Sequence, residues 1–349
     1  MQKNVNVLLA FCGSLATGPN LISLLKQINN RSVRVVGIDL NHDCAGRYLV
    51  DEFYKCPDDK EQFVQFVKKI CLKEKIDIIL CTSTENSLLP LKRNEEEFEK
   101  IGVKIPGSSY EKISLVSDKG TLLQQLSRSG LPTAQFKTPR TIKEFNDSLK
   151  QLGYPDKLVV VKPRVASGNR GFKILKNDHK VTYKDMNSKF NAMKPYITAE
   201  QYMDIVSSEE IFPELVLMEY LPGQDYSVYC LAKEGRAQVV IPFKRLKPSA
   251  GVSYISQVDM RADVIELARQ AIEYFGLEWN INIQMRISAA GIPLIYEINP
   301  RLAGSITLTA AANCNLVEHG INQVLGEQQL LPPPNDKTKM YRYLTELFV

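Results

Sequence analysis

The sequence predicts a protein of mixed α/β and α+β class, and three features of the chain support this prediction. Short apolar runs alternate with amphipathic segments over residues 4–100, as in an open parallel sheet covered by helices. A glycine-containing loop then follows an apolar strand near residue 165. Finally, two neighbouring apolar strands, 279–287 and 292–299, carry polar residues on one face and end in a proline–arginine pair.

Composition narrows the class of protein. The chain has 349 residues, of which 44% are hydrophobic and 24% charged, which is ordinary for a globular protein of two or three packed units. Its net charge is only +5 and its basic residues are scattered, so no nucleic-acid partner is predicted. An anionic small molecule fits this mild positive bias equally well.

Cysteines and apolar runs indicate the compartment. The seven cysteines form no CxxC pair, which predicts buried, reduced thiols rather than a zinc site. The N-terminal apolar run is too short for a signal sequence, and no segment reaches the roughly 18 apolar residues of a membrane span. We therefore expect a cytoplasmic protein with no membrane partner.

The first unit, residues 1–107, is expected to be a Rossmann-like domain with a parallel sheet. Its first turn, GSLATG at 13–18, matches GxGxxG only in part, although Asp39 ends the second strand where a ribose-binding acid would lie. Nicotinamide binding is therefore disfavoured. Glu85 lies at the end of the third predicted strand and is a candidate to bind substrate in the cleft. The predicted strands are 4–13, 31–40 and 76–86. A glycine-bearing turn and a helix are predicted over 14–28, and a second helix over 61–75.

Pro106 and Gly107 break the chain, and a helical connector is predicted for 108–132, with a helix from about Ser109 and a second helix ending before Pro132. The remaining units are 133–222, 223–330 and an extended tail, 331–349. The later predicted strands are 158–163, 171–175, 215–219, a hairpin over 225–243 with its turn at 233–235, 279–287 and 292–299. The later predicted helices are 183–210, 261–276 and 316–326.

The stretch LIYEINPR, residues 294–301, places a carboxylate and an amide two residues apart on one face of a strand. If Ile287 pairs with Ile292 across the SAAG turn, Gln284 lies opposite Ile295 on the face that carries Glu297 and Asn299. Three oxygen donors suit a magnesium ion that also holds phosphate oxygens. The alternative is a solvated polar face on an edge hairpin.

Cations that could hold phosphate occur at three places. Arg301 follows the turn fixed by Pro300 and would point at whatever the metal holds. Lys162 ends an apolar strand and is followed by the loop SGNRG, whose backbone N–H groups could approach phosphate closely. Lys119 opens a helix, where a cation is unfavourable without an anion nearby. A hairpin turn with a surface lysine is the alternative for the loop.

The linker EYLPG follows another apolar strand. Its exposed backbone could pair with an adenine edge, and Asp225 beyond it could accept from ribose hydroxyls; the alternative is a plain strand and turn. Basic side chains nearby could bind a substrate carboxylate, although a solvated basic loop explains them equally well. These basic candidates are Arg245, Lys247 and Arg286.

The order of these motifs resembles the ATP-grasp superfamily. The order is a lysine in the connector, a strand lysine, a glycine loop, an E-[YF]-L-P-G linker and a final [EQ]…E-x-N-P-R. Within that superfamily, the chain is similar to one ATP-grasp half of the carbamoyl phosphate synthetase large subunit and to stand-alone amino-acid ligases. The resemblance implies an ATP-grasp fold, with the Rossmann-like domain followed by a lid and nucleotide subdomain at 133–222 and an antiparallel catalytic domain at 223–330.

The resemblance also implies the role of each residue. ATP and Mg²⁺, with Mn²⁺ as an alternative ion, are the expected cofactors. Arg301 and Lys162 are the expected catalytic residues. The expected nucleotide contacts are Lys119, Lys162, Ser167, Gly168, Arg170, Glu219, Tyr220, Leu221 and Asp225. The expected metal ligands are Gln284, Glu297 and Asn299.

The implied activity is an ADP-producing ligase that joins a small carboxylate to an amine through an acyl-phosphate, and the implied assembly is a homodimer. Two alternatives stay open. One is a carbamoyl-phosphate-synthase-like activity on bicarbonate or carbamate with a partner subunit, and the other is a non-catalytic ATP-binding regulatory protein. The sequence carries neither a second synthetase half nor a glutaminase segment, so a complete carbamoyl phosphate synthetase is not expected.

Overall fold

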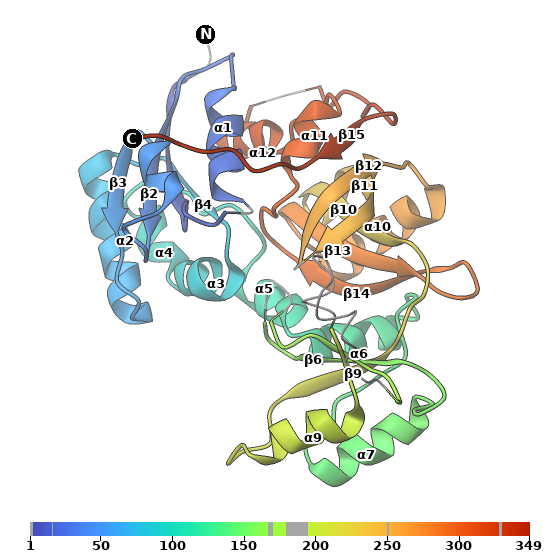
Figure 1. The fold of residues 1–349 in the computed structure, drawn as a ribbon. Helices are drawn as coiled ribbons and strands as arrows, with labels where there is room; N and C mark the ends of the chain where they lie inside the picture. Colours follow the sequence, from blue (N-terminus) through green and yellow to red (C-terminus); the bar gives the residue numbers. More distant parts are fainter. Residues whose placement is uncertain (1–2, 16, 167–169, 179–194, 250, 328–329) are drawn as a thin grey trace.

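The computed structural model describes residues 3–15, 17–166, 170–178, 195–249, 251–327 and 330–349. Within these residues the strands form three sheets, of four, five and six strands. Figure 1 shows an N-terminal lobe in blue, a lobe in green and yellow that holds α7 and α9, and a C-terminal lobe in orange and red. The predicted combination of a parallel α/β unit with antiparallel units is confirmed.

The N-terminal lobe is a parallel sheet of order β3-β2-β1-β4. Strands β1 and β4 are almost completely buried, as parallel strands covered on both faces are expected to be. The edge strand β3 was not predicted, because its sequence EFYK is short, polar and half exposed. The elements are β1 (Val5–Ala10), α1 (Gly18–Lys26), β2 (Val33–Asp39), η1 (Ala45–Tyr48), β3 (Glu52–Lys55), α2 (Lys60–Glu74), β4 (Ile78–Cys81), η2 (Thr84–Leu88), α3 (Leu89–Arg93) and α4 (Glu95–Glu99).

Two helices follow within the predicted connector, α5 (Tyr110–Ser117) and α6 (Lys119–Ser129). Each begins at a side-chain cap, because Ser109 accepts from the backbone of α5 and Asp118 accepts from the backbone of α6. Helix α6 ends at Gly130, whose φ of +76° suits a residue without a Cβ.

The second lobe is a mostly antiparallel sheet of order β5-β9-β6-β7-β8. Helices α7 and α9 pack on it through the core of Phe145, Tyr202 and Leu217. The helix predicted over 183–210 falls in part outside the described residues; of its remainder, 195–210, only α9 is helical. The elements are β5 (Phe136–Lys137), α7 (Ile142–Gln151), β6 (Val159–Pro163), β7 (Lys173–Leu175), β8 (Tyr196–Ile197), α9 (Ala199–Ser207) and β9 (Leu215–Glu219).

The C-terminal lobe is an antiparallel sheet of order β14-β13-β10-β11-β12-β15. Strand β15 lies in the predicted tail and pairs with β12, so part of that tail completes the sheet. Helix α10 covers one face, and α11 and α12 lie beside α1 near the other (Figure 1). The elements are β10 (Asp225–Lys233), β11 (Arg236–Ser249), β12 (Val252–Val258), α10 (Ala262–Phe275), β13 (Trp279–Ile287), β14 (Pro293–Asn299), α11 (Thr307–Ala311), α12 (Leu316–Leu325) and β15 (Lys339–Tyr341).

The predicted register of β13 and β14 is wrong by two residues. Ile287 pairs with Pro293 rather than with Ile292, and a bulge beside Met285 adds a second shift, so that Gln284 lies opposite Glu297. The bulge leaves one extra residue, Tyr296, in β14. Because two shifts of one residue restore the alternation of side chains, the polar residues still share one face.

The N-terminal and C-terminal lobes share one hydrophobic core. Leu21 and Leu25 of α1 pack in the same buried cluster as Tyr229 and Phe243 of the C-terminal sheet. At the edge of this cluster Arg31 donates to Asn322 at 2.7 Å and forms an ion pair with Glu327. The two lobes therefore form one packed body. Among the helices of the described residues, none combines the length and apolar character required to cross a membrane.

Candidate functional site

A cleft of about 1180 Å³ lies where the three lobes meet. The N-terminal lobe contributes loops at the carboxyl ends of its strands, which is where open α/β sheets bind ligands. The second lobe contributes β6, β7 and the segment after β9, and the C-terminal lobe contributes the polar face of its sheet. The N-terminal contribution includes Gly13, Ser14, Thr17, Asp39, Thr82, Ser83 and Asn86.

Oxygen donors gather on the C-terminal sheet. Gln284 lies opposite Glu297, and Asn282 lies opposite Asn299, so their side chains share the face toward the cleft. Asn299 donates to Glu297 Oε1 at 3.2 Å. Among the described residues no lysine or arginine forms an ion pair with Glu297. A carboxylate without a protein cation, flanked by amide oxygens, fits a hard ion such as Mg²⁺.

Two lysines face this donor set. Lys162, on β6, is buried and donates to the Tyr296 carbonyl oxygen at 3.3 Å. Burial lowers the pKa of Lys162 to about 8, and nearby Lys119 also lowers it, although Glu297 opposes the change. Because burial disfavours the ammonium form of Lys162, an anion bound in the cleft would stabilise that form.

The second lysine, Lys119, opens α6 and is also buried. Its Nζ donates to the Ala166 carbonyl oxygen at 2.5 Å, and its backbone N–H donates to the Arg164 carbonyl oxygen. Asp118 caps the same helix and pairs with Arg164 at 2.6 Å. The start of α6 is thereby tied to the chain that leads into the glycine loop.

Arg301 follows β14 directly and lines the cleft beside the oxygen donors. Its guanidinium donates to the Leu302 carbonyl oxygen at 2.9 Å and to Asn299 Oδ1 at 3.3 Å. Burial lowers the pKa of Arg301, while Glu85 and then Glu297 act to raise it. The cation is therefore held by its own turn and by the donor set.

The linker after β9 forms an apolar slot that suits a flat base. Glu219, Tyr220 and Leu221 all line the cleft there. The Glu219 carboxylate accepts from the Gln135 N–H at 2.9 Å, so this side chain also holds the edge of the second lobe's sheet. The apolar side chains that line the cleft around the linker are Val160, Phe172, Ile174 and Met218.

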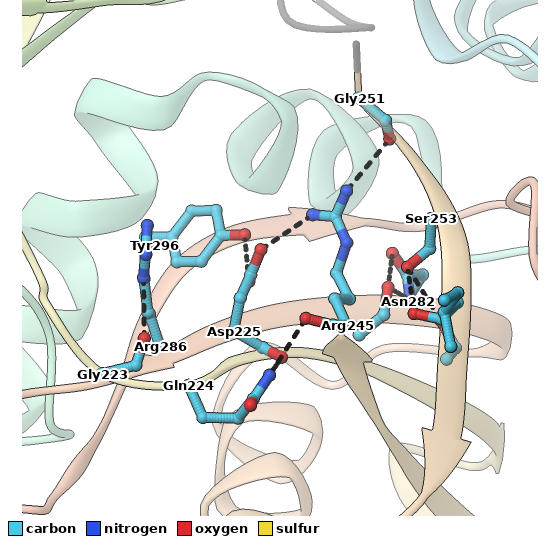
Figure 2. A network of polar contacts seen from close by, with 12 residues as sticks. Gly223, Gln224, Asp225, Arg245, Gly251, Ser253, Asn282, Arg286 and Tyr296 are labelled. Carbon is cyan, nitrogen blue, oxygen red and sulfur yellow. Dashed lines mark hydrogen bonds and ion pairs between the residues drawn. The ribbon is translucent and has the colours of Figure 1, made fainter. Parts of the chain in front are cut away.

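Asp225 is the centre of a buried polar network (Figure 2). Arg245 donates to Asp225 Oδ2 at 3.1 Å and Tyr296 donates to Oδ1 at 2.9 Å. Burial raises the pKa of Asp225, and Arg245 opposes this rise. Arg286 donates to the Gly223 carbonyl oxygen at 3.0 Å and lies 5.2 Å from the Tyr220 ring. The predicted ribose acid is therefore already paired with a predicted substrate arginine.

Of the other predicted residues that the structure describes, only Arg170 lines the cleft. Ser167 and Gly168 lie outside the described residues, whereas Arg170 lines the cleft. The side chain of Lys247 is exposed on β11 and does not line the cleft within the described residues. Glu85 is not among the described residues that line the cleft, although Asn86, which follows it, and Ser83, two residues before it, both do.

Sequence reasoning missed Tyr296 and Ser227 as cleft residues. Tyr296 would point to the apolar face of a regular β14, and the bulge in that strand could not be read from the sequence. Ser227 alternates with Tyr226 and Val228, which face α10, and this alternation was an available signal.

Two of the cysteines lie close to an acidic side chain. The ligand atoms of Cys12, Asp39 and Cys44 lie within 4.8 Å of one another near the mouth of the cleft. The Asp39 carboxylate already accepts from the N–H groups of Gly13 at 2.8 Å and Asn41 at 3.0 Å. Burial raises the pKa of the Cys12 thiol, which favours the neutral thiol over a metal-binding thiolate.

Comparison with known families agrees with this architecture. Residues 211–347 match the family described as "ATP-grasp in the biosynthetic pathway with Ter operon". Residues 9–106 match "PylC-like, N-terminal domain". The two matches together cover the N-terminal lobe and the C-terminal lobe.

Curated relatives are distant and longer. The chain is 25% identical over 252 residues to the uncharacterised protein y4rH of Sinorhizobium fredii, covering 69% of this chain and 48% of that protein. It is 23% identical over 316 residues to the arginine-specific large chain of carbamoyl phosphate synthase from Neurospora crassa, covering 85% of this chain and 24% of that one. The chain thus spans about half of the first relative and about a quarter of the second.

Solved structures share the fold. N5-carboxyaminoimidazole synthetase from Staphylococcus aureus superposes with a TM-score of 0.68 at 18% identity, covering 95% of this chain and 79% of that one. The biotin carboxylase domain of the Hydrogenobacter thermophilus 2-oxoglutarate carboxylase, solved as a dimer with MgADP and bicarbonate, gives 0.69 at 17% identity, covering 97% and 73%.

These matches confirm the predicted resemblance to one ATP-grasp half of the carbamoyl phosphate synthetase large subunit. The shared fold, the two family matches and the donor set opposite two lysines all lead to the same assignment. Residues 211–347 are therefore identified as an ATP-grasp region, and residues 9–106 as a PylC-like N-terminal domain.

Proposed function

We propose that this protein is an ATP-dependent carboxylate–amine ligase that releases ADP and phosphate. One observation carries the proposal: Glu297 and its amide neighbours face Lys162 across a cleft that also has an apolar slot. This arrangement offers oxygen ligands for Mg²⁺ or Mn²⁺, cations for a polyphosphate and space for a base.

The proposed reaction has two steps. A carboxylate oxygen of the first substrate attacks the γ-phosphorus of ATP, the bond to the β–γ bridging oxygen breaks, and ADP leaves. The amine then attacks the acyl carbon, loses a proton and displaces inorganic phosphate. Magnesium, when bound by Gln284, Glu297 and Asn299, would neutralise phosphate charge. Lys119 and Lys162 would hold the phosphates, and Arg301 would stabilise the transferring phosphoryl group.

The walls of the cleft would supply the remaining contacts. Glu219, Tyr220 and Leu221 are proposed to hold adenine. Asp225 is proposed to hold ribose through the second lone pair of its carboxylate oxygens, which already accept from Arg245 and Tyr296. Arg286 and Arg245 are the proposed sites for a substrate carboxylate. A homodimer is proposed as the assembly, because the Hydrogenobacter biotin carboxylase domain is described as a dimer.

A second candidate is an activity on bicarbonate of the carbamoyl phosphate synthase kind, with a partner subunit. It is favoured by the match of 85% of this chain to a carbamoyl phosphate synthase large chain. The two candidates differ in the first substrate, because bicarbonate would replace the organic acid.

Nucleotide product analysis tests the proposal directly. Purified protein is incubated with Mg²⁺, ATP and pooled amino acids and small carboxylates, and the nucleotides are separated. ADP and phosphate that depend on the pool are expected, and dividing the pool then identifies the substrates. ADP that depends on bicarbonate alone would select the second candidate. AMP with pyrophosphate would contradict an acyl-phosphate, and ATP binding without turnover would favour a regulatory role.

Glu297→Gln tests the donor set. Loss of the carboxylate is expected to lower kcat by about 100-fold or more, because the proposed metal, which would neutralise phosphate charge, loses its charged ligand. Glu273→Gln, at an exposed position on α10 of the same lobe, is the matched control and should retain wild-type turnover. Equal activity of the two variants would contradict the assignment of Glu297.

A further inference from the structure

Two polar atoms of opposite charge lie buried at the seam between the lobes. Oε2 of Glu85, in η2 of the N-terminal lobe, has no hydrogen-bond partner among the described residues. Nε of Arg301, at the end of β14, is likewise without one. Buried polar atoms are usually paired, so each orphan indicates a partner that is engaged in another state.

The rest of the Arg301 guanidinium is already occupied. One terminal nitrogen donates to the Leu302 carbonyl oxygen and the other to Asn299 Oδ1. Nε is therefore the donor that remains for a further partner. Burial lowers the pKa of Arg301, and among the charges that oppose this change Glu85 ranks before Glu297. A carboxylate from a different lobe thus acts on this arginine.

The turn that carries Glu85 is built to hold it at the cleft wall. Element η2 is a π-helical turn in which Leu88 N–H donates to the Ser83 carbonyl oxygen at 3.0 Å. Ser83 Oγ accepts from the Asn86 N–H, and both Ser83 and Asn86 line the cleft. Single π-helical turns are rare and occur often at functional sites.

We propose that Glu85 is a positioning residue for Arg301: its Oε2 accepts a hydrogen bond from Arg301 Nε and aims the guanidinium at the transferring phosphoryl group. Glu85 and Arg301 do not form an ion pair in the described structure, so this contact forms when the ligands fill the cleft. The N-terminal lobe would thereby complete the catalytic arrangement of the C-terminal sheet. The inference rests on the proposed function. It assigns Glu85 to Arg301 in place of the substrate contact expected from the sequence.

The kinetic test compares Glu85→Gln, Glu85→Asp, Arg301→Lys and the double variant Glu85→Gln/Arg301→Lys. Glu85→Gln is expected to lower kcat by about 10- to 100-fold, the usual effect of a group that orients a functional ligand, with KM values within about twofold of wild type. Glu85→Asp keeps the charge and should restore part of kcat. In the double variant, the Gln substitution should cost little beyond Arg301→Lys.

Several kinetic outcomes would overturn the proposal. An unchanged kcat in Glu85→Gln would remove any role for the carboxylate. A raised KM for the amine, or effects that multiply fully in the double variant, would indicate direct contact with substrate instead. Glu99→Gln, an exposed glutamate in the same lobe, is the matched control and should behave as wild type.

A second readout does not depend on turnover. The ¹⁵N–¹H signal of Arg301 Nε in the MgADP complex is assigned by its loss in Arg301→Lys. Glu85→Gln is expected to shift this signal and speed its exchange with solvent, whereas Glu99→Gln should not. An unchanged signal would overturn the inference. If wild-type protein turned over no substrate, the proposed function would fail, while this spectrum would still decide whether Glu85 holds Arg301.

Discussion

At the scale of one residue, the burial of Lys162 lowers its pKa and should make the proposed nucleotide binding depend on pH. Its pKa is lowered from 10.5 to about 8 because burial disfavours the ammonium form. The ammonium would therefore be present at pH 7 and lost as the pH rises through about 8 in the ligand-free protein. By linkage, the ligand-free protein should gain stability from this residue as the pH rises from about 8 toward 10.5.

The corresponding prediction concerns ATP affinity. Because a phosphate stabilises the ammonium, ATP binding should take up a proton above pH 8, and the Kd for MgATP should rise with pH there. Titration calorimetry in two buffers of different ionisation enthalpy measures that proton uptake. Lys162→Arg keeps its charge throughout this range, so its Kd should stay flat. A wild-type Kd that is equally flat would show that Lys162 does not face phosphate.

At the scale of elements, the stability of helix α6 is coupled to the proposed phosphate site, because Lys119 lies at the start of this helix. Asp118 caps α6 and also pairs with Arg164. Asp118→Ala should lower the free energy of unfolding by about 1 kcal/mol through loss of the cap, and should also weaken ATP binding because Lys119 loses its anchor.

Helix α2 supplies a matched control for this prediction. Asp59 caps α2 by accepting from the N–H groups of Glu61 and Gln62, and it is not among the described residues that line the cleft. Asp59→Ala should cost a similar free energy in urea unfolding and leave the Kd for ATP unchanged. If both variants weakened ATP binding equally, the loss would reflect general destabilisation and not the position of Lys119.

The elements also show what the sequence could predict and what it could not. Long periodic segments such as α2 and α10 were predicted within one or two residues, because a buried stripe repeats along them. The edge strand β3 and strand β15 were missed, because short strands at a sheet edge carry little apolar pattern. The oxygen donors of LIYEINPR could be placed on one face, whereas Tyr296 could not, because a bulge is set by tertiary packing.

Contacts between lobes decide how the whole molecule unfolds. The Arg31 side chain is completely buried, where it bonds Asn322 and Glu327 from the opposite end of the chain. Arg31→Ala should lower the free energy of unfolding by about 3 kcal/mol, because it removes a buried cation that holds both Asn322 and the partly buried Glu327 carboxylate. Since the lobes share a core, the loss should appear in a single calorimetric transition.

An exposed pair provides the comparison. Lys3 is 75% exposed and pairs with Asp77 at 3.4 Å, so Lys3→Ala should change stability by less than about 1 kcal/mol. Two separate melting transitions in Arg31→Ala would contradict the shared core, because they would mean that the lobes unfold independently once this contact is lost.

The bulge at Tyr296 also limits how the gene can change length. The pairing of β13 with β14 contains a one-residue offset at the bulge, between Gln284 and Met285. Inserting or deleting a single codon within β14 between Pro293 and Glu297 would turn Glu297 and Asn299 toward α10 unless the bulge disappeared at the same time. Two codons would preserve the orientation of both. Length variation in this hairpin should therefore come in even steps, which gives a rule for aligning and redesigning related chains.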